Sequence, residues 1–149
     1  MNAPPTVDDM MIAYAADAVD YVARVFGVEF DYSESTVKQV EAILGTLYEA
    51  RPKSWFEKLT MAGPTAEDID LITKMLGGYV GEVMKRNWGG RWKLESRAFP
   101  GKQVITFELA CGGDVWPPFK VGKRITNGPE DNVWHYFQAL REKHDPAGS

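Results

Sequence analysis

The chain has 149 residues, a formal net charge of −4 and a hydrophobic fraction of 44%. These values fit one ordinary globular domain, and they exclude a disordered, collagen-like or coiled-coil chain. The single cysteine excludes an intrachain disulfide and favours a reducing compartment, so we expect a cytoplasmic protein. No apolar run approaches the roughly 20 residues of a membrane span, and no basic residue precedes Arg24 as a secretory signal requires. We expect a single domain over residues 1–149, with flexible tails at 1–6 and 145–149.

Two helices are predicted in the first third of the chain, because apolar residues recur there at helical spacing. The first begins at Thr6, which forms a capping-box pattern with Asp9, and it ends at Gly27. The second is capped by Ser33 and ends before Pro52, since the residue before a proline is biased away from helix.

A third helix is predicted after a less regular segment, Lys53–Gly63, for which we expect only a short helical turn. Thr65 and Asp68 form its cap pattern, and the sequence Asn-Trp-Gly-Gly at 87–90 ends it. The glycines of this helix are spaced so that Gly77 and Gly81 share one face, which predicts close packing of a neighbouring strand or helix. A phosphate cradle is disfavoured because such loops follow a strand and open a helix.

The period of the apolar residues then changes to that of strands, at Arg91–Glu95, Val104–Leu109 and Val115–Trp116. The segment Phe119–Ile125 fits either a strand or a single helical turn. The sequence Asn-Gly-Pro at 127–129 introduces a last helix. Short turns between strands require antiparallel pairing. The predicted fold class is therefore α+β, with three N-terminal helices, a small antiparallel sheet of about three strands and one C-terminal helix.

The net charge is unevenly distributed along the chain. Residues 1–50 hold nine acidic and two basic residues, a net charge of −7, whereas residues 82–128 carry a net charge of +5. The two segments either neutralise each other or present separate charged faces to partners. The second possibility makes a set of acidic residues candidates for partner binding, namely Asp17, Asp20, Glu29, Asp31, Glu34 and Glu41.

Aromatic and basic residues alternate in the C-terminal half, where stacking on nucleic-acid bases is conceivable. The small sheet also needs large aromatic side chains for its core, so we favour packing and regard a nucleic-acid partner as the weaker interpretation. A pocket for a small molecule or peptide is an alternative use of this region. The candidate pocket residues are Tyr79, Glu82, Trp88, Arg91, Trp92 and Trp116.

Catalytic and metal-binding patterns are weak. Cys111 and His135 lack the surrounding motif of a nucleophile and its base, and Glu82 is followed by Lys85 and Arg86, with which an ordinary ion pair is expected. The spacing of nine residues between the two histidines does not place both on one helical face, and there is no Cys-x-x-Cys motif. We therefore expect no catalytic residue, no metal site and no cofactor.

Three short motifs carry a resemblance to a known family. They are Leu-Gly-Gly-Tyr-Val-Gly-Glu at 76–82, Gly-Gly-Arg-Trp at 89–92 and Pro-Phe-Lys-Val-Gly-Lys at 118–123. Over about residues 28–137 the chain resembles a family of small bacterial domains of unknown function. The resemblance implies no activity, but such domains are often immunity proteins encoded beside secreted toxins.

These observations lead to a ranked set of functional hypotheses. The first is an immunity protein that binds and neutralises a basic toxin through an acidic helical face, since opposite charge steers association. The alternatives are a small-molecule- or peptide-binding module that uses the tryptophan-rich region, and a small enzyme without a recognisable motif.

Overall fold

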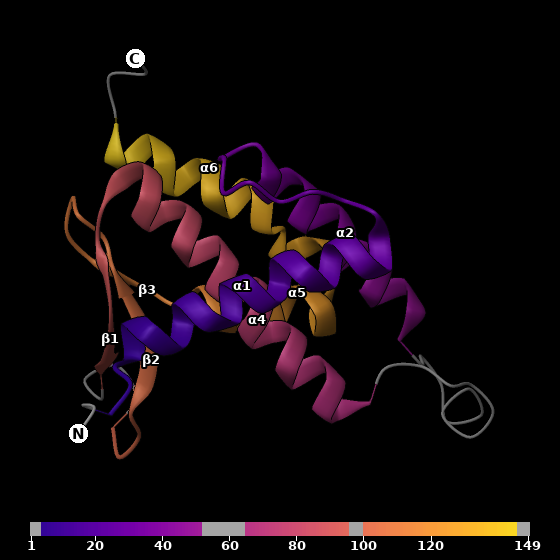
Figure 1. Ribbon diagram of the computed structural model, residues 1–149. Coiled ribbons are helices and arrows are strands. Elements are labelled where there is room, and N and C mark those ends of the chain that lie inside the picture. The colour runs from indigo at the N-terminus through magenta and orange to yellow at the C-terminus, as the bar shows by residue number, and fades with distance from the viewer. Residues whose placement is uncertain (1–3, 52–64, 96–99, 146–149) are drawn as a thin grey trace.

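The computed structural model describes residues 4–51, 65–95 and 100–145. Within these residues, five α-helices and one three-stranded antiparallel sheet form an α+β fold, so the predicted class is confirmed (Figure 1). The expected helical turn at Lys53–Gly63 lies outside the described residues. In chain order, the elements are α1 (Val7–Phe26), α2 (Thr36–Ala50), α4 (Ala66–Trp88), β1 (Arg91–Glu95), β2 (Val104–Glu108), β3 (Asp114–Val115), α5 (Pro117–Asn127), the 3-10 turn η1 (Pro129–Asp131) and α6 (Val133–His144).

The two predicted capping boxes are confirmed at the starts of α1 and α4. In α1, the Asp9 backbone N–H donates to Thr6 Oγ1 at 3.0 Å, and the Asp9 carboxylate accepts from the Thr6 N–H at 3.1 Å. Gly27 ends the helix in the left-handed conformation at φ 66°, as expected. Asp145 likewise closes α6 by donating its backbone N–H to the Arg141 carbonyl.

Helix α2 begins later than expected, because Ser33 is part of the preceding turn rather than the cap. The Ser33 backbone N–H donates to Asp31 Oδ1 at 3.0 Å, and the Ser33 carbonyl accepts from both the N–H and the hydroxyl of Thr36. Ser35 occupies the cap position without a side-chain capping bond. Tyr32, just before this turn, is the only described non-glycine residue with a positive φ, 65°.

The segment that fits either a strand or a helical turn forms helix α5, which the sequence interpretation did not include. Pro117 and Pro118 occupy its first turn, where a backbone N–H is not needed. Val121 and Ile125 follow on one buried face at helical spacing. The last helix also starts later than expected: residues 129–131 form a 3-10 turn, and Asn132 caps α6 by accepting from the His135 N–H at 2.8 Å.

Helix α4 is the centre of the core. Helix α1 crosses it on one side, the first turn of α5 packs on another, and the sheet lies beside its C-terminal half (Figure 1). A β-carbon on Gly77 would come within 2.3 Å of the Pro118 backbone, and one on Gly81 within 2.1 Å of the Trp92 ring. The structure therefore supports the packing interpretation of these glycines.

Candidate partner-binding site

Glu82 is a buried carboxylate, 1% exposed, that belongs to the core. Its Oε2 atom accepts from Trp92 Nε1 at 2.9 Å and lies 2.7 Å from Lys85 Nζ. Lys85 also reaches Asp8 of α1, with 3.4 Å between Nζ and Oδ2. These contacts confirm the expected ion pair with Lys85. They also bring together two of the candidate pocket residues, Glu82 and Trp92, in a contact that ties β1 to α4.

Tyr79 is fully buried and bonds to the turn before α2. Its hydroxyl oxygen accepts from the Tyr32 N–H at 2.8 Å and lies 2.8 Å from Thr36 Oγ1, which in turn donates to the Ser33 carbonyl. Burial raises the pKa of the Tyr79 hydroxyl, so it stays protonated as this chain of hydrogen bonds requires. The tyrosine therefore holds the strained Tyr32 backbone in place.

The other candidate pocket residues also have partners within the fold. The Trp88 indole donates to Glu34 Oε1 at 2.9 Å, and the Trp116 indole donates to Thr106 Oγ1 at 3.0 Å. Arg91 is exposed and pairs with Glu108. The polar atoms that a pocket ligand would contact are thus hydrogen-bonded within the protein.

The basic residues of the sheet are neutralised on the sheet itself. Arg91 and Lys93 contact Glu108 at 2.9 and 3.0 Å, and Lys93 also lies 3.0 Å from Asp114. The hydrogen bonds from Arg91 and then Lys93 hold the pKa of Glu108 below its usual value. The positive charges of these two sheet residues are therefore paired with carboxylates of the same sheet.

Two of the candidate acidic residues are structural. Glu41 joins α2 to α5 and α6, because its Oε2 accepts from Arg124 Nε and its Oε1 from the Val133 N–H, both at 2.8 Å. Glu34 accepts from the Trp88 indole and lies 3.8 Å from Arg141 Nε. Glu41 and Arg124 show that the acidic and basic segments interleave in part, as one of the two interpretations of the charge pattern predicts.

Asp31 and Glu29 are exposed in the connection between α1 and α2. Asp31 accepts from Ser33, and these hydrogen bonds hold its pKa below the usual value. Glu29 borders a shallow hollow beside Phe30 and Val19. Both carboxylates face solvent, and neither lines the groove that Asp17 and Asp20 border.

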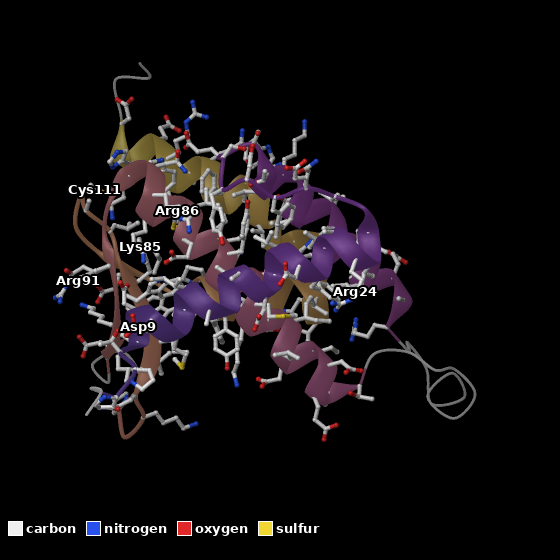
Figure 2. All side chains as sticks on the ribbon, in the orientation of Figure 1. Asp9, Arg24, Lys85, Arg86, Arg91 and Cys111 are labelled. Atoms are coloured by element: carbon white, nitrogen blue, oxygen red, sulfur yellow. The ribbon has the colours of Figure 1, made fainter. Side chains whose placement is uncertain are left out.

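Asp17 and Asp20 lie on the exposed side of α1 and border a groove between α1 and α4, which we call the acidic groove. Its volume is about 580 Å³. Neither carboxylate forms an ion pair with any described residue. Figure 2 shows Arg24, another lining residue, towards the C-terminal end of α1. The groove is lined by Asp17, Asp20, Tyr21, Arg24, Leu47, Asp68, Leu71, Ile72 and Met75.

The acidic groove carries an excess of negative charge. Three carboxylates and one guanidinium line it, which gives a net charge of −2. Hydrogen bonds from the backbone and hydroxyl of Thr65 hold the pKa of Asp68 below its usual value, so this carboxylate stays ionised. Burial raises the pKa of Tyr21, the charge of Asp68 raises it further, and Arg24 opposes that effect. The pKa of Tyr21 therefore responds to both the negative and the positive charge of the groove.

Sequence reasoning missed the α4 side of the groove. Asp68 was assigned only to the helix cap, a role that it does fill. Leu71 lies off the buried stripe of α4 that contains Ile72 and Leu76, and it is 49% exposed. That departure from the apolar periodicity is the one sequence signal that marks this side of the groove.

The residues considered for catalysis lie apart from the acidic groove. Cys111 is an exposed thiol in the turn between β2 and β3, where its Sγ lies 3.8 Å from the Gly112 carbonyl oxygen (Figure 2). His135 is exposed in the first turn of α6. In the parts of the chain that the structure describes, no group of three or more His, Cys, Asp and Glu side chains could hold a metal ion. None of the described helices combines the length and the apolar character needed to cross a membrane.

Comparisons with known proteins do not assign this chain to a family. No family model matches the sequence, and neither a curated protein nor a solved structure matches it. The resemblance carried by the motifs at 76–82, 89–92 and 118–123 therefore stays a prediction.

Proposed function

We propose that this chain is a non-enzymatic binding protein that neutralises a basic protein toxin, in the manner of an immunity protein acting in the cytoplasm. The observation that carries the proposal is the position of Asp17 and Asp20 on α1. These two exposed carboxylates form no ion pair with a described residue, and they border the acidic groove, which also has apolar lining residues. Exposed charge beside apolar surface is typical of protein–protein contacts.

The distribution of ion pairs supports this surface over the others. Lys85 and Arg124 bind acidic residues of the N-terminal third, so part of the charge division is internal pairing. The sheet lysine and arginine, Lys93 and Arg91, are paired as well. Asp17 and Asp20 have no ion-pair partner among the described residues, so their negative charge would accelerate association with a basic partner at low ionic strength.

The alternative binding module is not supported by a comparable observation. The indoles of Trp88, Trp92 and Trp116 and the hydroxyl of Tyr79 already have hydrogen-bond partners within the protein. A ligand in this region would have to replace those bonds, which costs free energy.

The proposal is tested by expressing the chain together with the products of its neighbouring genes. We expect a basic toxin to co-purify with the wild-type chain and to lose its toxicity in cells that produce the chain. The Asp17→Asn/Asp20→Asn double variant should retain its fold and protect less well. The proposal is wrong if no neighbouring product binds the wild-type chain and expression of the chain protects against none of them.

A further inference from the structure

The acidic groove is chemically divided into an apolar floor and a charged rim. Leu71, Met75 and Leu47 contribute aliphatic or thioether side chains from α4 and α2. Leu71 is 49% exposed, which leaves a large apolar side chain open to a partner. A site with this division is complementary to a side chain that has an apolar stem and a polar head.

The charges around the rim specify the sign of that head. Asp17 and Asp20 stand on the α1 side, and Asp68 stands across from them on α4. These carboxylates outnumber the single guanidinium of Arg24, which lines the same groove. A cation is therefore favoured there and an anion is repelled, so phosphate groups and nucleic acid do not fit.

Arginine fits the groove better than lysine does. Its guanidinium is planar and weakly hydrated, it can bond to two carboxylates at once, and it stacks on aromatic rings such as that of Tyr21. Its methylene stem would cover Leu71 and Met75. Arginine is also among the residues that contribute most to the free energy of protein–protein binding.

We infer that the acidic groove binds an arginine side chain presented by the protein partner, with the guanidinium between the α1 carboxylates and Asp68 and the stem along Leu71 and Met75. This inference rests on the proposed function, because it names the chemistry of that partner. Arg24 then has a defined effect: its positive charge competes with the incoming guanidinium, and removal of that charge strengthens binding.

The test uses a fluorescein-labelled amphipathic peptide of 12 residues, on the order of a typical helix length, built from leucine and arginine. The same peptide with citrulline in place of arginine is the neutral, nearly isosteric control. Affinities are measured for the wild type, for Asp17→Asn/Asp20→Asn, for Arg24→Gln and for Glu130→Gln. Glu130 is exposed in η1 and does not line the acidic groove, so its variant controls for the removal of one negative charge outside the groove.

We expect the double variant to weaken binding about tenfold and Arg24→Gln to strengthen it about threefold, as partly screened charge pairs predict. Glu130→Gln should leave the affinity unchanged, and citrulline should abolish binding. Methyl signals of Met75 and Leu71 should shift on addition of the arginine peptide. Thermal unfolding of each variant checks that the fold is retained.

Three results would overturn the inference: no binding of the arginine peptide, equal binding by the wild type and the double variant, or unmoved Met75 and Leu71 signals. The proposed function is judged separately by co-purification. If a toxin binds the wild type while the groove variants bind it equally well, the groove assignment is wrong and the proposed function stands. If no toxin binds, the proposed function fails whatever the peptide does.

Discussion

The ring of Trp92 fills the space that a β-carbon on residue 81 would need, because its Cζ2 atom lies 2.1 Å from that position. The indole is held from two further sides. Its Nε1 donates to Glu82, and its ring meets Phe107 edge-on with 5.2 Å between centroids. This contact joins the sheet to the central helix, so residue 81 controls how α4 and β1 pack.

Gly81→Ala is expected to destabilise the protein by about 2–3 kcal/mol, although alanine alone would favour the helix by about 1 kcal/mol. The ring cannot move aside without breaking its hydrogen bond to Glu82. Urea unfolding measures the change in free energy, and tryptophan emission should shift to longer wavelength. A variant as stable as the wild type would show that the ring relocates freely, contrary to the packing described.

Gly77→Ala is expected to cost at least about 2 kcal/mol, because the new β-carbon meets the Pro118 backbone at 2.3 Å. Gly122→Ala is the matched control in α5, since its β-carbon would lie 3.4 Å from Thr73 in an ordinary contact. The control should stabilise the protein by about 0.5–1 kcal/mol. Thermal unfolding distinguishes the two, and a stabilised Gly77→Ala variant would contradict the close approach of α4 and α5.

Glu41→Gln is expected to lower the free energy of unfolding by about 3 kcal/mol, since it leaves the Arg124 guanidinium without its counterion. Arg124 is 5% exposed, and its Nη1 atom has no hydrogen-bond partner, so little can compensate for the lost charge. Asp17→Asn should change stability by no more than about 0.5 kcal/mol. If Glu41→Gln and Asp17→Asn lowered the free energy of unfolding equally in denaturant, Glu41 would not be a structural carboxylate in contrast to Asp17.

Asp131 is expected to make stability depend on acidic pH. Hydrogen bonds from Asn127 and Lys120 hold its pKa below the ordinary value of 3.8. A lowered pKa in the folded state means that the contribution is present above the unfolded pKa and is lost as pH falls through the folded one. Asp131→Asn should therefore be less stable than the wild type near pH 7, by about 1–2 kcal/mol.

The difference between Asp131→Asn and the wild type should begin to shrink below about pH 4, where the carboxyl of the unfolded chain becomes protonated. It should disappear only when the pH falls below the lowered pKa of the folded state. Unfolding midpoints in urea across pH 3 to 7 provide the measurement. A difference that stays constant with pH would mean that the ionised carboxylate adds no stability.

The parts of the fold that depend on neighbours in sequence were predicted well. The capping boxes at Thr6 and Thr65 and the glycine at position 27 act within one helical turn, so local patterns specify them. By sequence alone, the segment that forms α5 fits either a strand or a helical turn. Tertiary contacts decide such cases, and a sequence does not display them.

The candidate site was predicted only in part for the same reason. Asp17 and Glu41 are both acidic residues on helices. Only the fold shows that Arg124 binds Glu41, whereas Asp17 forms no ion pair with a described residue. The acidic groove also combines Asp17 with Leu47 and Met75, which come from separate helices. Periodicity identifies the buried face of each helix but not which exposed residues meet across a groove.

The central claim is tested most directly by titrating the purified chain with the basic product of a neighbouring gene, at low and at physiological ionic strength. The account predicts a saturable complex with the wild type, weaker at higher salt, and a weaker complex with Asp17→Asn/Asp20→Asn. A complex that is indifferent to these two carboxylates and to salt would contradict binding through the acidic surface of α1. The absence of any complex would contradict the neutralising function itself.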